Sequence, residues 1–281
     1  MSAASGARLG LNGRAVFGGG VLALLVIVAL LAPWLAPHDP LEQDLLNTLS
    51  RPSWLGGEPG FLLGTDSLGR DILSRIVYGS RAALMVAVVA ALLAGVLGTV
   101  LGLLAGYFGR WIDTLISRVV DVWMSFPAVL LSIVLAAVLG AGLHTVVIAI
   151  VVIDWTRFCR VVRSEVLVQR EQDYVACAVT IGLAPWRILG IEVLPNVTPL
   201  LLTLFTLEMG IAIVVEAILS FVGLSASNIA TWGGMIAEGR QYVNQAWWLM
   251  AFPMACVIVS VLGLNALGDG LRDRLDPVKQ R

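Results

Sequence analysis

The sequence predicts an all-α membrane protein with six transmembrane helices. Of its 281 residues, 58% are hydrophobic and only 13% are charged, so polar side chains are too few to cover a soluble protein of this size. The mean hydropathy of +0.90 and several long charge-free runs place most of the chain in lipid. This composition excludes a disordered protein, a nucleic-acid-binding module and an ordinary cytosolic enzyme.

The first two predicted spans lie in residues 15–37 and 82–109, which are 23 and 28 residues without a charge. Crossing a bilayer core takes ~20 helical residues, so each run is long enough. The first run also resembles the apolar region of a signal peptide, with small residues near Ala36. Its length and proline-rich exit favour an uncleaved helix, whereas cleavage would leave five spans and separate the termini.

The remaining four spans follow from two further stretches and one interrupted run. Between Val122 and Ile153 no acidic or basic residue occurs except His144, and the glycines at 140 and 142 predict two helices joined by a tight turn. Residues 193–237 carry only two charges, and residues 241–268 carry none. These stretches predict the fifth and sixth helices.

The distribution of Lys and Arg predicts which side each loop occupies, because basic loop residues resist translocation. With the N-terminus inside, 13 of the 18 basic residues are cytoplasmic. The predicted domains are a cytoplasmic tail (1–15), a transmembrane domain (16–270) and a second cytoplasmic tail (271–281), with an external loop near 37–80 and a cytoplasmic loop near 157–196.

The chain lacks the residues that common catalytic and metal sites require. Its single lysine is Lys279, in the C-terminal tail, so no Gly-Lys-Ser/Thr loop for ATP phosphates can exist. His38 and His144 belong to no metal-binding pattern. The three cysteines, at 159, 177 and 256, are scattered and predict neither disulfides nor a zinc site. We therefore expect no catalytic residue and no bound metal.

Small residues and charges within the predicted spans suggest helix contacts. Glycines at 98, 102 and 106 recur every four residues and form a smooth stripe that another helix can approach closely. Asp154 precedes Arg157 by three residues, which predicts an ion pair at the membrane interface.

Glu208 and Glu216 lie eight residues apart on the fifth span, on roughly one face. A carboxylate in lipid is costly, so each needs a partner or a wet cavity. Two interpretations remain open: a role along a translocation path or its gate, and structural pairing with a neighbouring helix.

The cytoplasmic loop is too long for a simple connector and predicts two short helices. The first holds small side chains at 176–178 and stops at Gly182, and the second begins at Pro185. Trp186 and Ile188 supply apolar anchors, and the chain breaks at 194–196 before the fifth span. A DNA-reading helix-turn-helix fits poorly, because both ends are tethered to membrane helices.

This loop resembles the EAA loop of ABC-importer permeases of the dipeptide, oligopeptide and nickel type. Five more blocks agree in the right order: Gly64-Thr-Asp-Ser-Leu-Gly-Arg-Asp-Ile-Leu-Ser-Arg75, Glu216-Ala-Ile-Leu-Ser-Phe-Val-Gly-Leu224, Trp232-Gly-Gly-Met-Ile-Ala-Glu-Gly-Arg240, Ala246-Trp-Trp248 and Gly268-Asp-Gly-Leu-Arg-Asp-Arg-Leu-Asp-Pro277. Three positions depart from the family pattern: Asp173 replaces the usual Glu, Cys177 replaces the first paired alanine, and Glu192 replaces a common histidine.

The resemblance implies a type I importer permease fold and a division of labour. The loop would be a coupling helix in a groove of a P-loop ATPase subunit, which would use ATP and Mg²⁺, while this chain would bind no cofactor. The residues that the resemblance places on the docking surface are Asp173, Tyr174, Cys177, Ala178 and Gly182.

The other implied partners are a second permease subunit, lipid, and a solute-binding protein that docks on the periplasmic side, where the Gly64-Thr-Asp motif would lie. The resemblance implies a multi-pass protein of the bacterial inner membrane that moves peptides or similar solutes and contacts no nucleic acid. Gly182→Trp or Ala178→Arg is expected to abolish ATP-dependent uptake by blocking the groove. An ion-coupled secondary transporter using Glu208 and Glu216 is the alternative.

Overall fold

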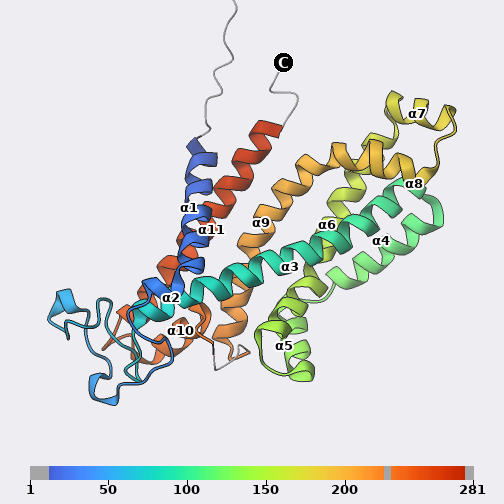
Figure 1. Cartoon of the computed structure of the whole chain (residues 1–281). Helices are drawn as coiled ribbons and strands as arrows, with labels where there is room; N and C mark the ends of the chain where they lie inside the picture. The colour runs from blue at the N-terminus through green and yellow to red at the C-terminus, as the bar shows by residue number, and fades with distance from the viewer. Residues whose placement is uncertain (1–12, 225–228, 276–281) are drawn as a thin grey trace, which may run out of the picture.

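A computed structural model describes residues 13–224 and 229–275, which form helices joined by turns and by one long connection (Figure 1). We call this connection, residues 36–71, the extended segment; it includes two short 3-10 helices, Leu45–Asn47 and Ser53–Leu55. Within these residues there is no β-strand, only an isolated bridge between Thr65 and Asp71. The outermost parts of both predicted tails lie outside the described residues. The helices are α1 (Gly13–Leu30), α2 (Ala32–Leu35), α3 (Ile72–Phe108), α4 (Arg110–Met124), α5 (Ala128–Leu139), α6 (Leu143–Arg170), α7 (Asp173–Thr180), α8 (Pro185–Ile188), α9 (Leu194–Phe221), α10 (Trp232–Gly239) and α11 (Trp248–Leu275).

The described residues contain four helical stretches long and apolar enough to cross a membrane: Gly13–Leu30, Ile72–Phe108, Pro185–Phe221 and Trp248–Arg274. A fifth arises if α4 and α5, which meet at a bend of 85°, count as one broken span. Pro127 lies in this bend, where a proline disfavours helical geometry in the residue before it. α6 is long enough but carries three charges within 18 residues of its start, so the count of six stays a prediction.

The glycine stripe on α3 packs against α6, as the sequence predicts. A Cβ atom on Gly98 would lie 2.3 Å from the carbonyl oxygen of Trp155, and one on Gly102 would lie 2.8 Å from that of Cys159. α3 and α6 therefore approach more closely than larger side chains would allow.

α1 packs along α11 and is fastened to the start of α3. Gly18 lies against the backbone of Leu267, where a Cβ would approach within 2.3 Å. Arg81 on α3 donates a hydrogen bond from Nε to the carbonyl of Ala29, at the C-terminal end of α1. This contact satisfies a carbonyl that has no partner within its own helix.

The helix predicted to end near Arg157 extends to Arg170, so the first third of the expected cytoplasmic loop is helical. Two ion pairs with α4 support this extension: Arg163 with Asp113, and Arg160 with Asp121 at 3.2 Å. Arg160 and Arg163, which mark where α6 leaves the lipid, therefore also hold α6 and α4 together.

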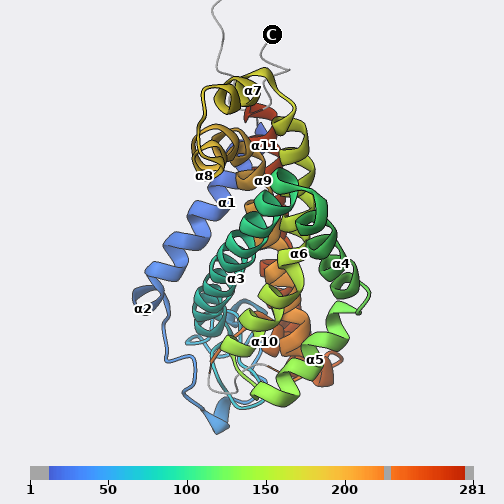
Figure 2. The same cartoon turned by 90° about the vertical axis from the view of Figure 1, so that its right-hand side faces the viewer.

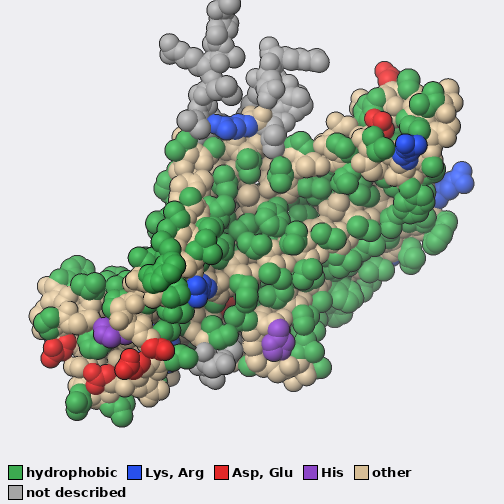
Figure 3. Space-filling view, in the orientation of Figure 1, with side chains coloured by type: hydrophobic (Ala, Val, Ile, Leu, Met, Phe, Trp, Pro, Cys, Tyr) green, Lys and Arg blue, Asp and Glu red, His purple; other side chains and the backbone are tan. Residues whose placement is uncertain are grey.

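The molecule has two distinct ends. In both ribbon views α7 and α8 lie at the same end as the described termini, whereas α2, α5, α10 and the extended segment lie at the other end (Figures 1 and 2). Between the ends, hydrophobic side chains cover the visible surface, and acidic side chains gather on the extended segment (Figure 3). This distribution is that of a membrane protein with a polar region at each end.

Candidate functional site

The two short helices predicted after α6 are α7 and α8. Gly182 ends the first with a φ of +82°, and the N–H of Leu183 donates to the carbonyl of Ala178 at 3.1 Å. Non-glycine residues adopt this conformation at a cost, so Gly182 sets the turn. Pro185 then occupies the first turn of α8, where its missing N–H is not needed. We call residues 173–188 the coupling hairpin.

The inner face of the coupling hairpin packs on the membrane helices. Val175 and Ala178 are buried in an apolar cluster whose other buried members are Val162, Val166, Ile188, Leu189, Val193 and Val197. This cluster includes residues of α6, α7, α8 and α9, so the hairpin is packed onto these helices and is not a free loop.

Tyr174 ties the hairpin to both neighbouring helices. Its hydroxyl donates to Oε1 of Gln169 at 2.5 Å and accepts a hydrogen bond from Nδ2 of Asn196 at 3.3 Å. Burial raises the pKa of the Tyr174 hydroxyl above its ordinary value. Asn196 also donates to the backbone carbonyl of Glu192 at 2.6 Å, so Glu192 takes part through its backbone.

The outer face of the hairpin is exposed and partly apolar. Asp173, Cys177 and Gly182, three of the five residues expected on a docking surface, lie on it, whereas Tyr174 is half-buried. Beside them are three large apolar side chains, Val179, Ile181 and Trp186, which are 57%, 75% and 67% exposed. Apolar side chains gathered on a short exposed hairpin are typical of a protein contact.

Ala178, which was expected on the docking surface, is instead buried, with 4% of its surface exposed. It follows Val175 by three residues and therefore shares its inward face, whereas Cys177 points outward. The expectation that Ala178→Arg acts by blocking a groove is wrong, because the arginine would first disrupt the packing beneath the hairpin.

Glu208, on α9, is buried and forms an ion pair with α6. Its Oε2 accepts a hydrogen bond from Nη1 of Arg157 at 2.9 Å, and Nη2 of Arg157 lies 3.6 Å from Oδ1 of Asp154. The predicted pair of Asp154 and Arg157 is thus present, but a residue of another helix joins it. Within the described part of the chain, Oε1 of Glu208 is buried without a hydrogen-bond partner.

Glu216 lies in a separate environment on the same helix. It is 1% exposed, and its Oε1 accepts a hydrogen bond from the hydroxyl of Ser220. Ser220 in turn accepts a hydrogen bond from Thr231, in the segment before α10, at 3.4 Å. Glu208 and Glu216 therefore do not form one site.

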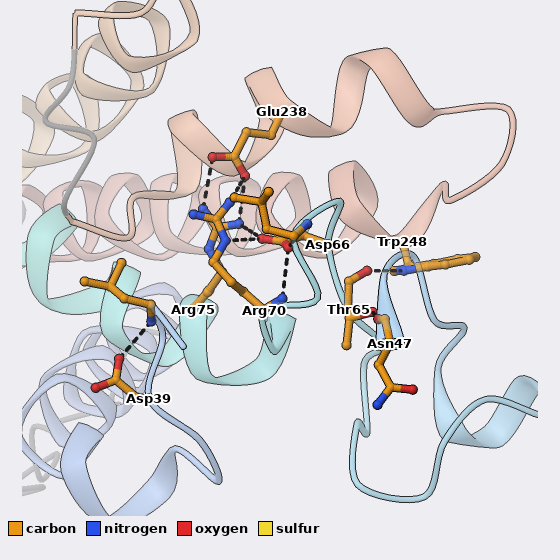
Figure 4. Close-up of polar contacts among 10 residues, drawn as sticks. Asp39, Asn47, Thr65, Asp66, Arg70, Arg75, Glu238 and Trp248 are labelled. Carbon is orange, nitrogen blue, oxygen red and sulfur yellow. Dashed lines mark hydrogen bonds and ion pairs between the residues drawn. The ribbon is translucent and has the colours of Figure 1, made fainter. Parts of the chain in front are cut away.

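The motif that begins at Gly64 forms a buried ion network (Figure 4). The carboxylate of Asp66 accepts hydrogen bonds from Nε of Arg70 at 2.6 Å and from Arg75. Both arginines also bind the carboxylate of Glu238 on α10, at 2.8 and 2.7 Å. The carbonyl of Thr65 accepts a hydrogen bond from the indole of Trp248 at 3.3 Å.

This network joins the extended segment, α3, α10 and α11. Thr65, Asp66 and Arg75 are each less than 5% exposed, so the motif itself is structural and does not form an external docking surface. Both blocks of this network stand out in the sequence, but no local pattern pairs them, because Arg75 and Glu238 are 163 residues apart.

Comparison with known proteins places these features in a family. Residues 98–280 match the family described as binding-protein-dependent transport system inner membrane component, and residues 7–52 match the N-terminal transmembrane domain of oligopeptide transport permease C.

Several curated relatives match nearly the whole chain. The di/tripeptide transport system permease protein DppC of Pseudomonas aeruginosa (strain UCBPP-PA14) is 41% identical, over 92% of this chain and 87% of the relative. The probable D,D-dipeptide transport system permease protein DdpC of Escherichia coli (strain K12) is 38% identical, over 92% and 85%. The dipeptide transport system permease protein DppC of the same strain is 39% identical, over 95% and 89%.

The fold also resembles a solved structure. A chain of the MetNI methionine ABC transporter, in an inward-facing conformation, superposes with a TM-score of 0.59 and covers 72% of this chain and 96% of its own length. The two sequences are 18% identical, so this likeness concerns the fold alone.

Proposed function

Because the chain belongs to the family of binding-protein-dependent transport system inner membrane components, we propose that it forms half of the path by which an ATP-driven importer takes up short peptides. A second, homologous permease subunit supplies the other half. The peptide assignment is supported by the relatives, whose names describe dipeptide and tripeptide transport systems. Glu208 is engaged by Arg157, and nothing in the comparisons favours ion-coupled transport.

The observation that carries the proposal is the exposed outer face of the coupling hairpin. We infer that Asp173, Cys177 and Gly182, together with Val179, Ile181 and Trp186, dock in a groove of a partner ATPase subunit. Tyr174 and Ala178 support this surface from within. When the ATPase dimer closes, the hairpin transmits the movement to α6 and α9, to which its inner face is packed.

The energy source lies outside this chain. Its only lysine is Lys279, so a Walker A loop is absent and ATP with Mg²⁺ is used by the partner subunits. The chain acts as a permease subunit and binds no cofactor itself.

The proposed location is the bacterial inner membrane, with both termini and the coupling hairpin in the cytoplasm. The hairpin and the described termini lie at one end of the molecule, which supports this topology (Figure 2). The acidic extended segment at the other end then faces the periplasm, where a solute-binding protein delivers the peptide.

Reconstitution in proteoliposomes tests the proposed function. Vesicles that contain this chain, the companion permease, the ATPase subunits and the binding protein should import radiolabelled dialanine when ATP is supplied on the ATPase side. Uptake should stop when the ATPase subunits are omitted and persist when the proton gradient is collapsed. Import by this chain alone would contradict the proposal, and so would uptake that stops when the proton gradient is collapsed.

A further inference from the structure

Arg157 pairs with Glu208 at the middle of α9, which belongs to a candidate membrane span, and it therefore lies deeper than the interfacial position that the charge pattern of the sequence predicts. It lies at the midpoint of α6 (Leu143–Arg170), and Glu208 lies at the midpoint of α9 (Leu194–Phe221). Each of these 28-residue helices is about 42 Å long, and a bilayer core is ~30 Å thick. Whichever ~30 Å stretch of such a helix crosses the core, that stretch includes the midpoint. The Arg157 side chain is nevertheless 45% exposed.

A guanidinium at this depth does not face lipid without a large cost in free energy. Its exposed part must therefore face a water-filled space or another protein subunit. The path of an importer built from two permeases is such a space, and it runs between the subunits rather than inside one of them.

The two carboxylates beside Arg157 lie behind it and not in front of it. The side chains of Asp154 and Glu208 are 9% and 2% exposed. Of the five N–H donors of the guanidinium, only one on Nη1 has a hydrogen-bond acceptor among the described residues, namely Glu208. The group that α6 and α9 present at their surface is thus a cation with free donors.

We propose that Arg157 lines the translocation path and binds the C-terminal carboxylate of the passing peptide, while Glu208 and Asp154 act as positioning residues. This inference rests on the proposed function, in which the cargo is a peptide. A planar guanidinium matches a carboxylate through two parallel hydrogen bonds. A single contact without an enclosing pocket suits a path, where cargo must bind and also leave.

The test compares import of dialanine with import of its C-terminal amide by the complete importer. Binding-protein preference is the same in every assay, so the informative quantity is the change in the acid-to-amide ratio between variants. Arg157→Gln should lower this ratio about tenfold, the loss expected for one charge-assisted hydrogen-bonded pair. Arg157→Lys keeps the charge without the planar fork and should lower the ratio by a smaller factor.

Arg160→Gln is the matched control. Arg160 lies three residues further along α6, is 55% exposed and pairs with Asp121. It should leave the acid-to-amide ratio unchanged. If the melting temperature shows that Arg157→Gln does not fold, the acid-to-amide ratio of Arg157→Lys is compared with that of the wild type instead.

Two results would overturn the inference. In the first, Arg157→Gln slows import of acid and amide by the same factor or leaves both unchanged. In the second, a well-folded Arg157→Gln subunit no longer co-purifies with the companion permease, which would place Arg157 in the subunit interface. If the wild-type importer takes up neither peptide, the proposed function itself fails, which is a distinguishable outcome.

Discussion

Gly98, Gly102 and Gly106 determine how closely α3 and α6 approach. Gly98→Ala places a methyl group 2.3 Å from a backbone oxygen of α6, where no side-chain adjustment can relieve the overlap. We expect this substitution to destabilise the protein by about 1–3 kcal/mol. Gly95→Ala, on the same helix, meets only the Phe158 ring, at 3.4 Å, and should change stability little. Thermal unfolding in detergent of both variants measures the difference, and equal melting temperatures would contradict the prediction.

Asp66 is the residue on which the buried ion network depends. Its side chain is 2% exposed and contacts both arginines, whereas Glu238 is 38% exposed. Asp66→Asn should therefore cost about 3–5 kcal/mol, because it leaves two buried guanidinium groups with only the partly exposed Glu238 as a carboxylate partner. Glu238→Gln should cost no more than about 1 kcal/mol, since water screens that carboxylate. Melting temperatures that rank the two variants in the opposite order would refute this account.

The residue types of the candidate site could be predicted from the sequence, but their orientation could not. Small side chains at 176–178 indicate a helix that packs closely, yet only the fold shows that Ala178 faces inward and Cys177 outward. The spacing of Glu208 and Glu216 places them on one face, but their partners come from α6 and from the segment before α10. Such long-range pairs leave no local pattern in the chain.

At the scale of elements, the coupling hairpin has an exposed face, to which we assign docking, and a buried face that packs on the membrane helices. Ile181→Asp adds a charge to the exposed surface, so we expect it to abolish ATP-dependent uptake without lowering the melting temperature. Val175→Asp is the matched change on the buried face and should lower the melting temperature, because an unpaired carboxylate enters an apolar cluster. Uptake assays and thermal unfolding on the same preparations distinguish the two effects. Undiminished uptake with Ile181→Asp would remove the docking assignment.

Helix positions were more predictable than helix limits. Charge-free runs identify α1, α3, α9 and α11, because burial in lipid requires such runs. The runs do not show that α3 begins at Ile72 or that α6 continues to Arg170, since ion pairs and caps allow helices to extend beyond the lipid. Asp71, which caps α3 by accepting a hydrogen bond from the N–H of Ser74 at 2.9 Å, is one such device.

At the scale of the whole molecule, the coupling hairpin and the ion network lie at opposite ends of the same bundle (Figure 1). α9 runs between them, from the cluster under the hairpin to the segment that packs on α10. A displacement of the hairpin by a partner therefore has a continuous, well-packed route to the far end. This arrangement is what an importer driven from one side of the membrane requires.

Cys177 provides the most direct test of the claim that the hairpin docks on an ATPase subunit. It is exposed, whereas Cys159 is buried and Cys256 is partly buried, and Cys177→Ser measures the background. A membrane-impermeant maleimide should label Cys177 only from the cytoplasmic side of oriented vesicles, and assembly with the ATPase subunits should protect it. Labelling from the periplasmic side, or labelling that the bound ATPase leaves unchanged, would contradict the account.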